Sequence, residues 1–403
     1  MKKIIFSIFS CIFVFIFMSL IFADGWVQNG GLYYYQQNGD YVKNQFVNTM
    51  DGSYYLDQNG IMVSNNWIDF QDGRIYYAKD DGRIATNGIS KINGNAYYFD
   101  RESLLQKGWI DDLYYANDNG FLVTGFQELS IPKTWYTENS KQTEGWFYFD
   151  NNYKKVYSEN NPYKTKMIGD DIYCFDTNGI LRTGWRMIKE TEPAMKGYMY
   201  FSENETKDFK FAAAVKNSWF ANELPTEVVN GSDVHYFYFT GSGYLHCANV
   251  GLYSKYRVNE KTYLFNQYGY AVYGIRKVGN DYYFFGSSNT DCSMKTGKLT
   301  LTDNAGNTNE YYFNEKGVGY TGVYKNKLYY KGLLQKADAH SKYVAYMIES
   351  KPILVNTAGL VQKNKRKIKD GDGCQWTTSE TGMVTYTDEG NIEQPEAPYL
   401  TED

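Results

Sequence analysis

Histidine is scarce in this chain. Only three occur among 403 residues, His235, His246 and His340, and no two of them have the spacing of zinc ligands. The sequence also contains no nucleophile elbow, phosphate-binding loop or metalloprotease helix motif. We therefore expect a protein that is not an enzyme and that uses neither a cofactor nor a metal.

Cysteine is also sparse, with five in the chain. Cys174, Cys247, Cys292 and Cys374 lie at wide, irregular intervals, which argues against a dense disulfide framework and against a zinc motif. Cys174 occupies a position where similar segments carry tyrosine. We therefore expect it to pack as a small hydrophobic side chain in a strand.

Positive charge is not in excess. Lysine and arginine number 41 against 46 acidic residues, giving a net charge of −5. Non-specific nucleic-acid binding requires basic groups that neutralise phosphates, so no nucleic-acid partner is expected. Residues 363–369 are a local exception with five basic side chains, which fits either a solvated loop or a contact to an anionic wall polymer.

Long apolar runs are absent after the first 23 residues. Lys2 and Lys3 precede an apolar run over residues 4–23, and polar Asp24 follows Ala23. This pattern favours a signal peptide over residues 1–23, with a membrane anchor as the alternative. We expect a secreted protein or one at the cell surface or cell wall, with a membrane contact only if this segment is not cleaved.

Tyrosine and glycine are abundant, at 41 and 37 residues, whereas proline numbers only 7. Pairs of aromatic residues recur about every 20 residues in the first part of the chain, each usually followed by a glycine. Turn pairs such as Asp72-Gly73 and Asn93-Gly94 separate short aromatic and β-branched segments, which is a strong β-hairpin signal. One hairpin is marginal alone, but stacked copies bury a shared core.

The sequence therefore predicts an all-β fold, a solenoid of stacked β-hairpin repeats of about 20 residues with longer insertions. The repeat array is expected over residues 24–330, with insertions near 127–145 and 202–234. Residues 331–403 are expected to hold divergent terminal repeats and an acidic tail that is frayed after Asp388.

Aspartates recur in step with the hairpins, at Asp57, Asp100, Asp150 and Asp176. This periodicity is typical of turn-stabilising side chains rather than of catalytic carboxylates. Asp370 and Asp372 resemble the start of a calcium loop, but the later ligands are missing.

Clustered aromatic residues are the candidates for ligand binding. Residues two apart in a strand share a face, so three hairpins should each present several rings on one side. Such rings can face a sugar or a quaternary ammonium group, or they can pack on one another as core. The predicted ligand-binding residues are Phe126, Trp146, Tyr148, Trp185, Tyr198, Tyr200, Trp219, Tyr236 and Tyr238.

The segments Gly184-Trp185, Tyr97-Tyr98-Phe99-Asp100 and Thr124-Gly125-Phe126 resemble the cell-wall-binding repeat family. That family includes choline-binding modules, glucan-binding repeats and the receptor-binding repeats of clostridial toxins. The resemblance implies a non-catalytic, exported bacterial surface protein that binds carbohydrate or cell-wall polymer through repeated aromatic sites. The alternatives are a structural or adhesion scaffold whose aromatics are all core, and a choline-binding wall anchor.

Choline-binding relatives build cages from a tryptophan on the first strand of a hairpin, a tryptophan before the tyrosine pair and a neighbouring tyrosine. The resemblance places the second tryptophan only at Trp146. Other copies carry different residues there: Leu32, Ser53, Ile75, Ala96, Leu113 and Ile172. This departure favours a glycan partner, with choline-bearing teichoic acid as the other candidate.

Overall fold

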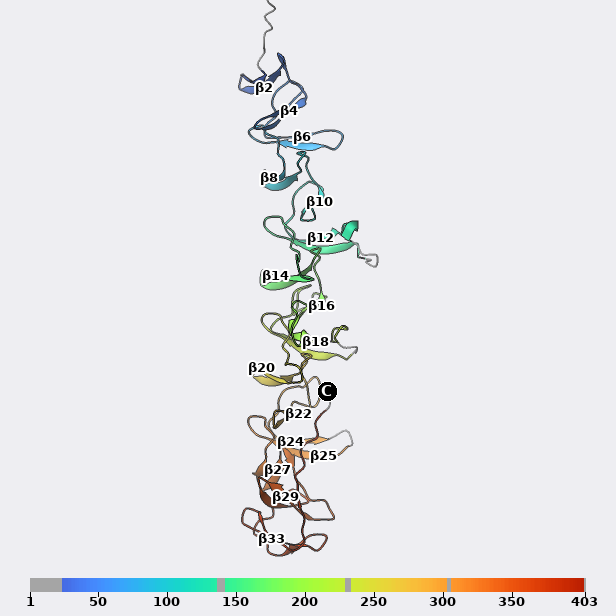
Figure 1. The fold of residues 1–403 in the computed structure, drawn as a ribbon, viewed down its shortest axis with the longest axis vertical. Helices are drawn as coiled ribbons and strands as arrows, with labels where there is room; N and C mark the ends of the chain where they lie inside the picture. Colours follow the sequence, from blue (N-terminus) through green and yellow to red (C-terminus); the bar gives the residue numbers. More distant parts are fainter. Residues whose placement is uncertain (1–23, 136–141, 229–232, 303–305, 402–403) are drawn as a thin grey trace, which may run out of the picture. The chain divides into compact units, whose positions relative to one another are not determined.

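The computed structural model describes residues 24–135, 142–228, 233–302 and 306–401. The predicted signal peptide lies outside these ranges. Within them the chain is all-β, and Figure 1 shows one short hairpin after another along each part of the chain. No helix in the described ranges is both long and apolar enough to cross a membrane. The chain divides into two compact units, residues 1–156 and 157–403.

The first unit consists of consecutive antiparallel hairpins. Its two-stranded sheets pair β4 with β5, β6 with β7, β8 with β9, β10 with β11 and β12 with β13, while β1, β2 and β3 form a three-stranded sheet. Its elements are β1 (Gly25–Asn29), β2 (Leu32–Gln37), β3 (Asp40–Tyr41), β4 (Gln45–Thr49), β5 (Gly52–Leu56), β6 (Asn66–Asp69), β7 (Ile75–Ala78), β8 (Gly88–Ile92), β9 (Asn95–Phe99), β10 (Gly108–Ile110), β11 (Tyr114–Ala116), β12 (Gly125–Ser130), the 3-10 helix η1 (Lys133–Trp135) and β13 (Glu144–Phe149).

The second unit continues the pattern and then becomes less regular. Pairs of consecutive strands from β14 to β23 form two-stranded sheets, followed by a five-stranded sheet and two three-stranded sheets. Its elements are β14 (Tyr163–Ile168), β15 (Asp171–Asp176), β16 (Gly184–Met187), η2 (Ala194–Gly197), β17 (Tyr198–Phe201), β18 (Ser218–Asn222), β19 (His235–Phe239), β20 (Ser254–Val258), β21 (Lys261–Phe265), β22 (Ile275–Val278), β23 (Asp281–Phe284), β24 (Gly297–Thr302), β25 (Thr308–Phe313), β26 (Gly322–Tyr324), β27 (Lys327–Tyr330), β28 (Leu333–Leu334), β29 (Tyr343–Ile348), β30 (Lys351–Asn356), β31 (Ile368–Lys369), β32 (Gln375–Thr378), β33 (Val384–Thr387) and β34 (Ile392–Glu393).

Within each unit, backbone hydrogen bonds join successive hairpins. The loop residue six positions after a hairpin bridges to the end of its own second strand. Its N–H group then donates to the preceding hairpin, to the carbonyl of the residue just before the aromatic pair. Examples are Ile84 to Ser53 at 2.8 Å and Ala271 to Tyr236 at 2.9 Å. This loop residue, here called the junction residue, therefore lies where two hairpins meet.

Each hairpin divides its aromatics between two faces. The residue that ends the second strand points into the core, and Phe99, Phe149 and Phe239 are fully buried there. The second residue of the aromatic pair lies opposite the first-strand aromatic, as Tyr77 does opposite Trp67. The first-strand aromatic also contacts the first aromatic of the pair in the next hairpin. For example, the ring centroids of Trp67 and Tyr97 are 4.9 Å apart. The period-2 pattern thus builds the core and an aromatic seam together.

The recurring aspartates cap turns, as predicted. Asp57 Oδ1 accepts the backbone N–H groups of Asn59 and Ile61 at 2.8 and 2.9 Å. Asp176 Oδ1 accepts those of Asn178 and Ile180 at 2.9 and 2.8 Å. These carboxylates satisfy backbone donors that the turns leave unpaired. Cys174 is buried in β15, as expected for a hydrophobic position.

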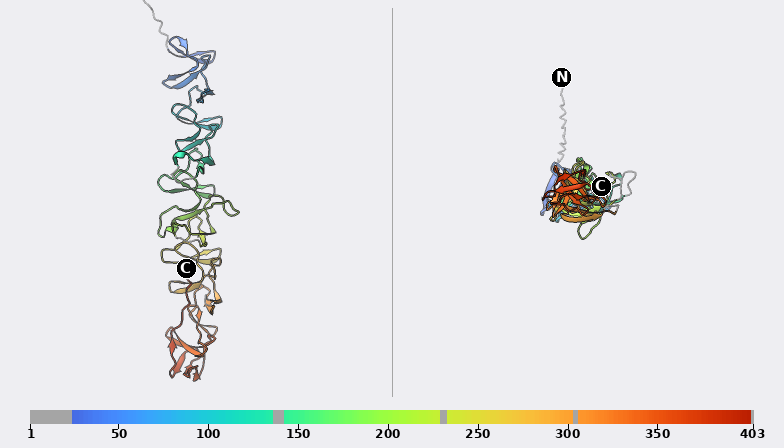
Figure 2. Two further views of the ribbon diagram at one scale, coloured as in Figure 1. Left: turned by 90° about the vertical axis from the view of Figure 1, so that its right-hand side faces the viewer. Right: turned by 90° about the horizontal axis from the view of Figure 1, so that it is seen from below.

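The prediction of a frayed tail after Asp388 is wrong. Strand β34 pairs in parallel with β29, through Ile392 beside Ala345 and Glu393 beside Tyr346. The chain then runs back along the second unit, and Thr401 N–H donates to the carbonyl of Ile275 at 3.0 Å. Figure 1 marks the end of the chain near β22, and Figure 2 shows it away from the red end of the ribbon. Composition pointed to disorder, but specific backbone partners hold the segment.

Candidate ligand-binding site

Hairpin β18–β19 carries three of the predicted residues, all of them partly exposed. Trp219 lies opposite Tyr238, and Ala221 lies opposite Tyr236. Residues two apart share a face, so all three aromatic side chains project from one side of this hairpin. The small side chain of Ala221 leaves room beside Tyr236.

The next hairpin supplies a third wall. The Tyr263 ring on β21 lies 4.7 Å from the Trp219 ring, with the two planes 61° apart. Trp219 also contacts Tyr238 at 5.4 Å and stacks on buried Phe265 at 5.7 Å. The indole is therefore fixed by core contacts on one side.

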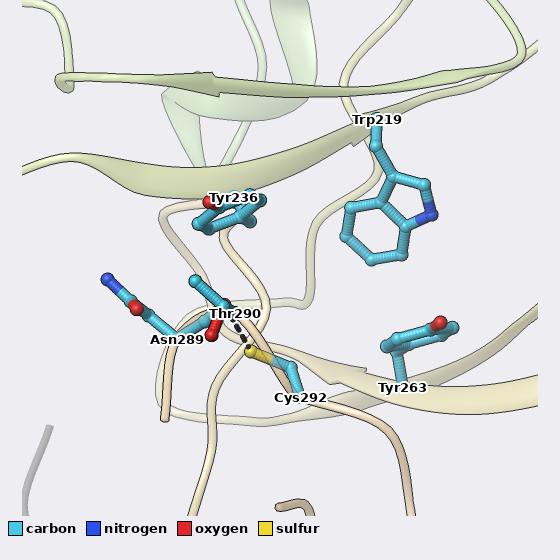
Figure 3. Close-up of a pocket in the computed structure, with 6 residues that line it drawn as sticks. All are labelled: Trp219, Tyr236, Tyr263, Asn289, Thr290 and Cys292. Carbon is cyan, nitrogen blue, oxygen red and sulfur yellow. Dashed lines mark hydrogen bonds between the residues drawn. The ribbon is translucent and has the colours of Figure 1, made fainter. Parts of the chain in front are cut away.

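The open side of Trp219 faces a cavity of about 220 Å³. Figure 3 shows Trp219, Tyr236 and Tyr263 around it, with the loop after β23 opposite them. That loop contributes Asn289, Thr290 and Cys292. The cavity thus has three aromatic walls from two hairpins and a partly polar fourth wall.

Burial favours the neutral forms of Cys292 and Tyr263 in the cavity lining. Burial raises the pKa of Cys292 to about 11, and its Sγ donates to the backbone carbonyl of Asn289 at 3.0 Å. Burial also raises the pKa of Tyr263. The nearby Asp291 carboxylate accepts hydrogen bonds from Lys295 Nζ at 2.7 Å and Ser293 Oγ at 3.1 Å. The cavity is therefore lined by aromatic, amide, hydroxyl and thiol groups without a formal charge of their own.

An equivalent junction in the first unit already holds a cation. There the junction residue is Lys155, whose N–H donates to the Leu113 carbonyl at 2.8 Å. Its ammonium group lies 4.0 Å from the centroid of the Trp135 ring and 5.2 Å from that of Trp109. At the open cavity the junction residue is Ala271, whose methyl group cannot reach so far. The same backbone position thus supplies a cation in one repeat and leaves space in the other.

The other predicted residues have different surroundings. Tyr198 and Tyr200 are only 3% and 4% exposed, in a cluster with Trp185, Phe237 and Phe239. Leu224 and Val228, from the long insertion, pack on the same cluster, and Trp185 Nε1 donates to the Glu223 carbonyl at 3.0 Å. Tyr198 and Tyr200 are part of the core here, and ligand binding at this hairpin stays a prediction.

Hairpin β12–β13 brings its predicted rings together on one face. Phe126 lies opposite Tyr148, with ring centroids 5.0 Å apart, and Trp146 lies opposite Glu128 on the same face. Trp146 is 36% exposed. This hairpin offers an accessible indole beside a carboxylate, and its role in binding stays a prediction.

Sequence reasoning missed Tyr263, Asn289, Thr290 and Cys292, which follow the predicted cluster by 25 residues or more in the chain. The repeat itself could have indicated Tyr263, because Trp67 and Trp109 also contact the first aromatic of the next pair. The loop residues carry no local signal and reach the cavity only through the fold.

A second group was missed because of a shift of one residue. The run Leu32-Tyr33-Tyr34-Tyr35 allows two alignments, and the prediction placed Leu32 before the pair. The register pairs Trp26 with Tyr35, so Tyr33 precedes the pair and shares the Trp26 face. Trp26 and Tyr33 are exposed, and the Tyr54 ring lies 4.7 Å from Trp26. This junction repeats the aromatic positions of the open cavity, with Met62 as its junction residue.

The basic loop at residues 363–369 is exposed at each of its five basic side chains. Its backbone is held by Thr378 Oγ1, which accepts the Lys365 N–H at 3.0 Å. A contact between this loop and an anionic wall polymer stays a prediction.

No family model and no curated protein matches the chain. The chain does resemble solved structures of choline-binding proteins. CbpJ from Streptococcus pneumoniae TIGR4 is 19% identical with a TM-score of 0.44, covering 74% of this chain and 99% of that protein. Choline binding protein F from Streptococcus pneumoniae is 19% identical with a TM-score of 0.41, covering 80% and 98%. The modular autolysin LytC from Streptococcus pneumoniae, solved with a synthetic peptidoglycan ligand, is 18% identical with a TM-score of 0.31, covering 62% and 52%.

Proposed function

We propose that this protein is a non-catalytic binder of a cell-wall polymer and that the Trp219 cavity takes a quaternary ammonium group carried by that polymer. The observation that carries the proposal is the placing of three aromatic walls, from two successive hairpins, around one small cavity. Electron-rich ring faces attract a cation, and each contact contributes about 0.5–2 kcal/mol depending on desolvation.

Two features of the surroundings support a cationic ligand. Lys155 shows that an aromatic junction of this chain accommodates an ammonium group. The neutral lining of the open cavity neither repels a cation nor holds a competing one. A trimethylammonium group also combines charge with apolar methyl surface, which suits rings rather than carboxylates.

A neutral sugar is the second candidate, and the polar wall favours it. Asn289 and Thr290 can exchange hydrogen bonds with hydroxyl groups while a ring face covers the C–H side of a sugar. This glycan partner is the one that the sequence analysis preferred. Sugar binding requires the Asn289 and Thr290 side chains, whereas cation binding requires the three aromatic rings.

The wider proposal includes the location and organisation of the protein. Residues 1–23 act as a signal peptide, and residues 24–330 form the binding array. Residues 331–403 are divergent terminal repeats with an acidic tail. The protein acts on the bacterial surface. Each site is expected to be weak. Repeated sites on one polymer can raise overall affinity by about 10²–10⁴ when the ligand spans them.

The decisive experiment compares choline with 3,3-dimethylbutan-1-ol, its uncharged isostere, by NMR titration of the chain starting at Asp24. The cation proposal expects saturable choline binding, a choline Kd about 2- to 30-fold higher in Tyr236→Ala, and no binding of the isostere. Equal binding of both compounds would rule out cation recognition. Binding of a glucan or chitin oligomer that depends on Asn289 and Thr290, without choline binding, would establish the sugar alternative.

A further inference from the structure

The last described segment of the chain returns across the second unit and is held mainly through its backbone. Buried Gln335 clamps Glu396: its Oε1 accepts the Glu396 N–H at 2.9 Å, and its Nε2 donates to the Glu396 carbonyl at 3.0 Å. At the far end, Ile275 N–H donates to Thr401 Oγ1 at 2.9 Å, and Arg276 donates to the Thr401 carbonyl at 2.8 Å. Residues 392–401, here called the strap, thus connect β29 with β22.

The strap covers an aromatic cluster between hairpins β22–β23 and β24–β25. Ala397 packs against the cluster that contains Ile275, Tyr282 and Tyr311, and the neighbouring Pro398 is buried. Tyr282 and Tyr311 are 8% and 6% exposed. By comparison, Tyr236 and Tyr263 at the open cavity are both partly exposed.

The covered cluster occupies the same repeat position as the open cavity. The Gly319 N–H donates to the Tyr282 carbonyl at 2.7 Å, as the Ala271 N–H does to Tyr236. Tyr311 is the first aromatic of the next pair, as Tyr263 is. The glycine is needed for a close approach here, because a Cβ at Gly319 would lie 2.3 Å from the backbone carbonyl oxygen of Lys331. Leu333 of β28 lies opposite Tyr311 and belongs to the same cluster, so the strap and the chain over residues 331–333 together cover the two tyrosine rings.

We propose that the strap is a removable cover over a second binding site and that this site takes a saccharide unit of the wall polymer. The inference rests on the proposed function in assuming a polymer ligand, but it concerns different residues. A cation is disfavoured here because the Lys331 ammonium already lies 5.3 Å from the centroid of the Tyr282 ring. A sugar can stack its C–H face on tyrosine and bond its hydroxyl groups to Gln335 and Arg276, which now bond the strap.

The strap can detach from the second unit without the unfolding of a hairpin. Pro395 and Pro398 have no N–H to donate, so the segment cannot form a continuous strand with its neighbours. Glu393, Glu396, Tyr399 and Leu400 are exposed. Segments with few buried contacts and separated hydrogen bonds open locally more easily than core strands.

The test uses the chain from Asp24 with Tyr236→Ala as background, so that the open cavity is impaired. Ala397→Lys places a cation in the apolar cluster near Arg276 and Lys331 and should expel the strap. Tyr399→Lys is the matched control, because Tyr399 is 81% exposed. Release is read from hydrogen exchange of the Ile275 amide, and ligand binding from NMR titration with the N-acetylglucosamine trimer.

The expected result for Ala397→Lys is at least tenfold faster exchange at Ile275 and one additional saturable trimer site. Tyr399→Lys should show neither change. A second variant, Glu396→Pro, removes the N–H that Gln335 accepts and should give the same gain. Release without a new trimer site would overturn the masked-site proposal, as would protection of Ile275 in both release variants. Failure of choline binding in the unmodified chain would instead contradict the proposed function.

Discussion

Replacing Tyr236 with alanine separates ligand binding from folding better than replacing Trp219. Among the described residues, Tyr236 makes no ring–ring contact, and its cross-strand neighbour is the small Ala221. Trp219 packs on three aromatic rings, so its loss would disturb the core as well. The tyrosine is thus the cavity wall that contributes least to the hairpin.

The expected loss of choline affinity in Tyr236→Ala follows from the removal of one of the three rings around the cavity. A cation–π contact of about 0.5–2 kcal/mol corresponds to a rise in the choline Kd of about 2- to 30-fold. Loss of a cross-strand pair changes the free energy of unfolding by about 0.2–1 kcal/mol, so the chain should stay folded. Tyr236→Phe keeps the ring and should bind choline within about twofold of the original chain.

The assay is choline titration monitored by NMR, with urea denaturation of the same samples. The reasoning would be refuted if Tyr236→Ala bound choline normally while remaining folded, because the third ring would then make no contact with the ligand. It would also be refuted if Tyr236→Phe lost binding as fully as the alanine variant, since a hydroxyl contact and not the ring face would then be responsible.

Three further predictions concern other junctions and pH. Trp185→Ala should lower the free energy of unfolding by about 3 kcal/mol, measured by urea denaturation, because this indole is packed in the core. Lys155→Ala should add a choline site beside Trp109, whereas Lys155→Met should not, and NMR titration would count the sites. Burial alone would raise the pKa of Glu310, but hydrogen bonds from two lysines and a tyrosine lower it from 4.5 to about 2. Its contribution of about 1–2 kcal/mol, after allowance for screening, should therefore be present above pH 4.5 and be lost as the pH falls towards 2.

Each of these has a clear opposing result. If Trp185→Ala kept normal stability but lost ligand binding, Trp185 would be a ligand-binding residue and not a core residue. An unchanged number of choline sites in Lys155→Ala would mean that the lysine does not occupy a ligand position. Glu310→Gln should remove the part of the acid dependence that this carboxylate supplies, so an unaltered pH profile would contradict the assignment.

Local chemistry made the hairpins predictable. Asp72-Gly73 and Asn93-Gly94 provide turn geometry within a few residues, and alternating aromatics define the two faces of the adjoining strands. The capping role of Asp57 is equally local, because its carboxylate and the two backbone N–H groups that donate to it lie in one turn. An all-β array of stacked hairpins therefore followed from the sequence.

Register was less certain where the sequence is ambiguous. In Leu32-Tyr33-Tyr34-Tyr35 either neighbouring pair fits the pattern, and a shift of one residue moves every side chain to the other face. Only the pairing of Trp26 with Tyr35 decided that Tyr33 belongs to the aromatic group. The prediction failed there because tyrosine suits both faces.

The tertiary structure alone decided which aromatic junctions are open. Trp185 and Trp219 have the same repeat position, yet Leu224 and Val228 of a long insertion pack around the first, while Ala271 leaves a cavity beside the second. Those neighbours come from 39 to 52 residues further along the chain, and their effect depends on side-chain volume at a distant contact. The strap is a stronger case, because Thr401 meets Ile275 across 126 residues. The sequence by itself determined the repeat and its turns, whereas long-range packing determined which rings a ligand can reach.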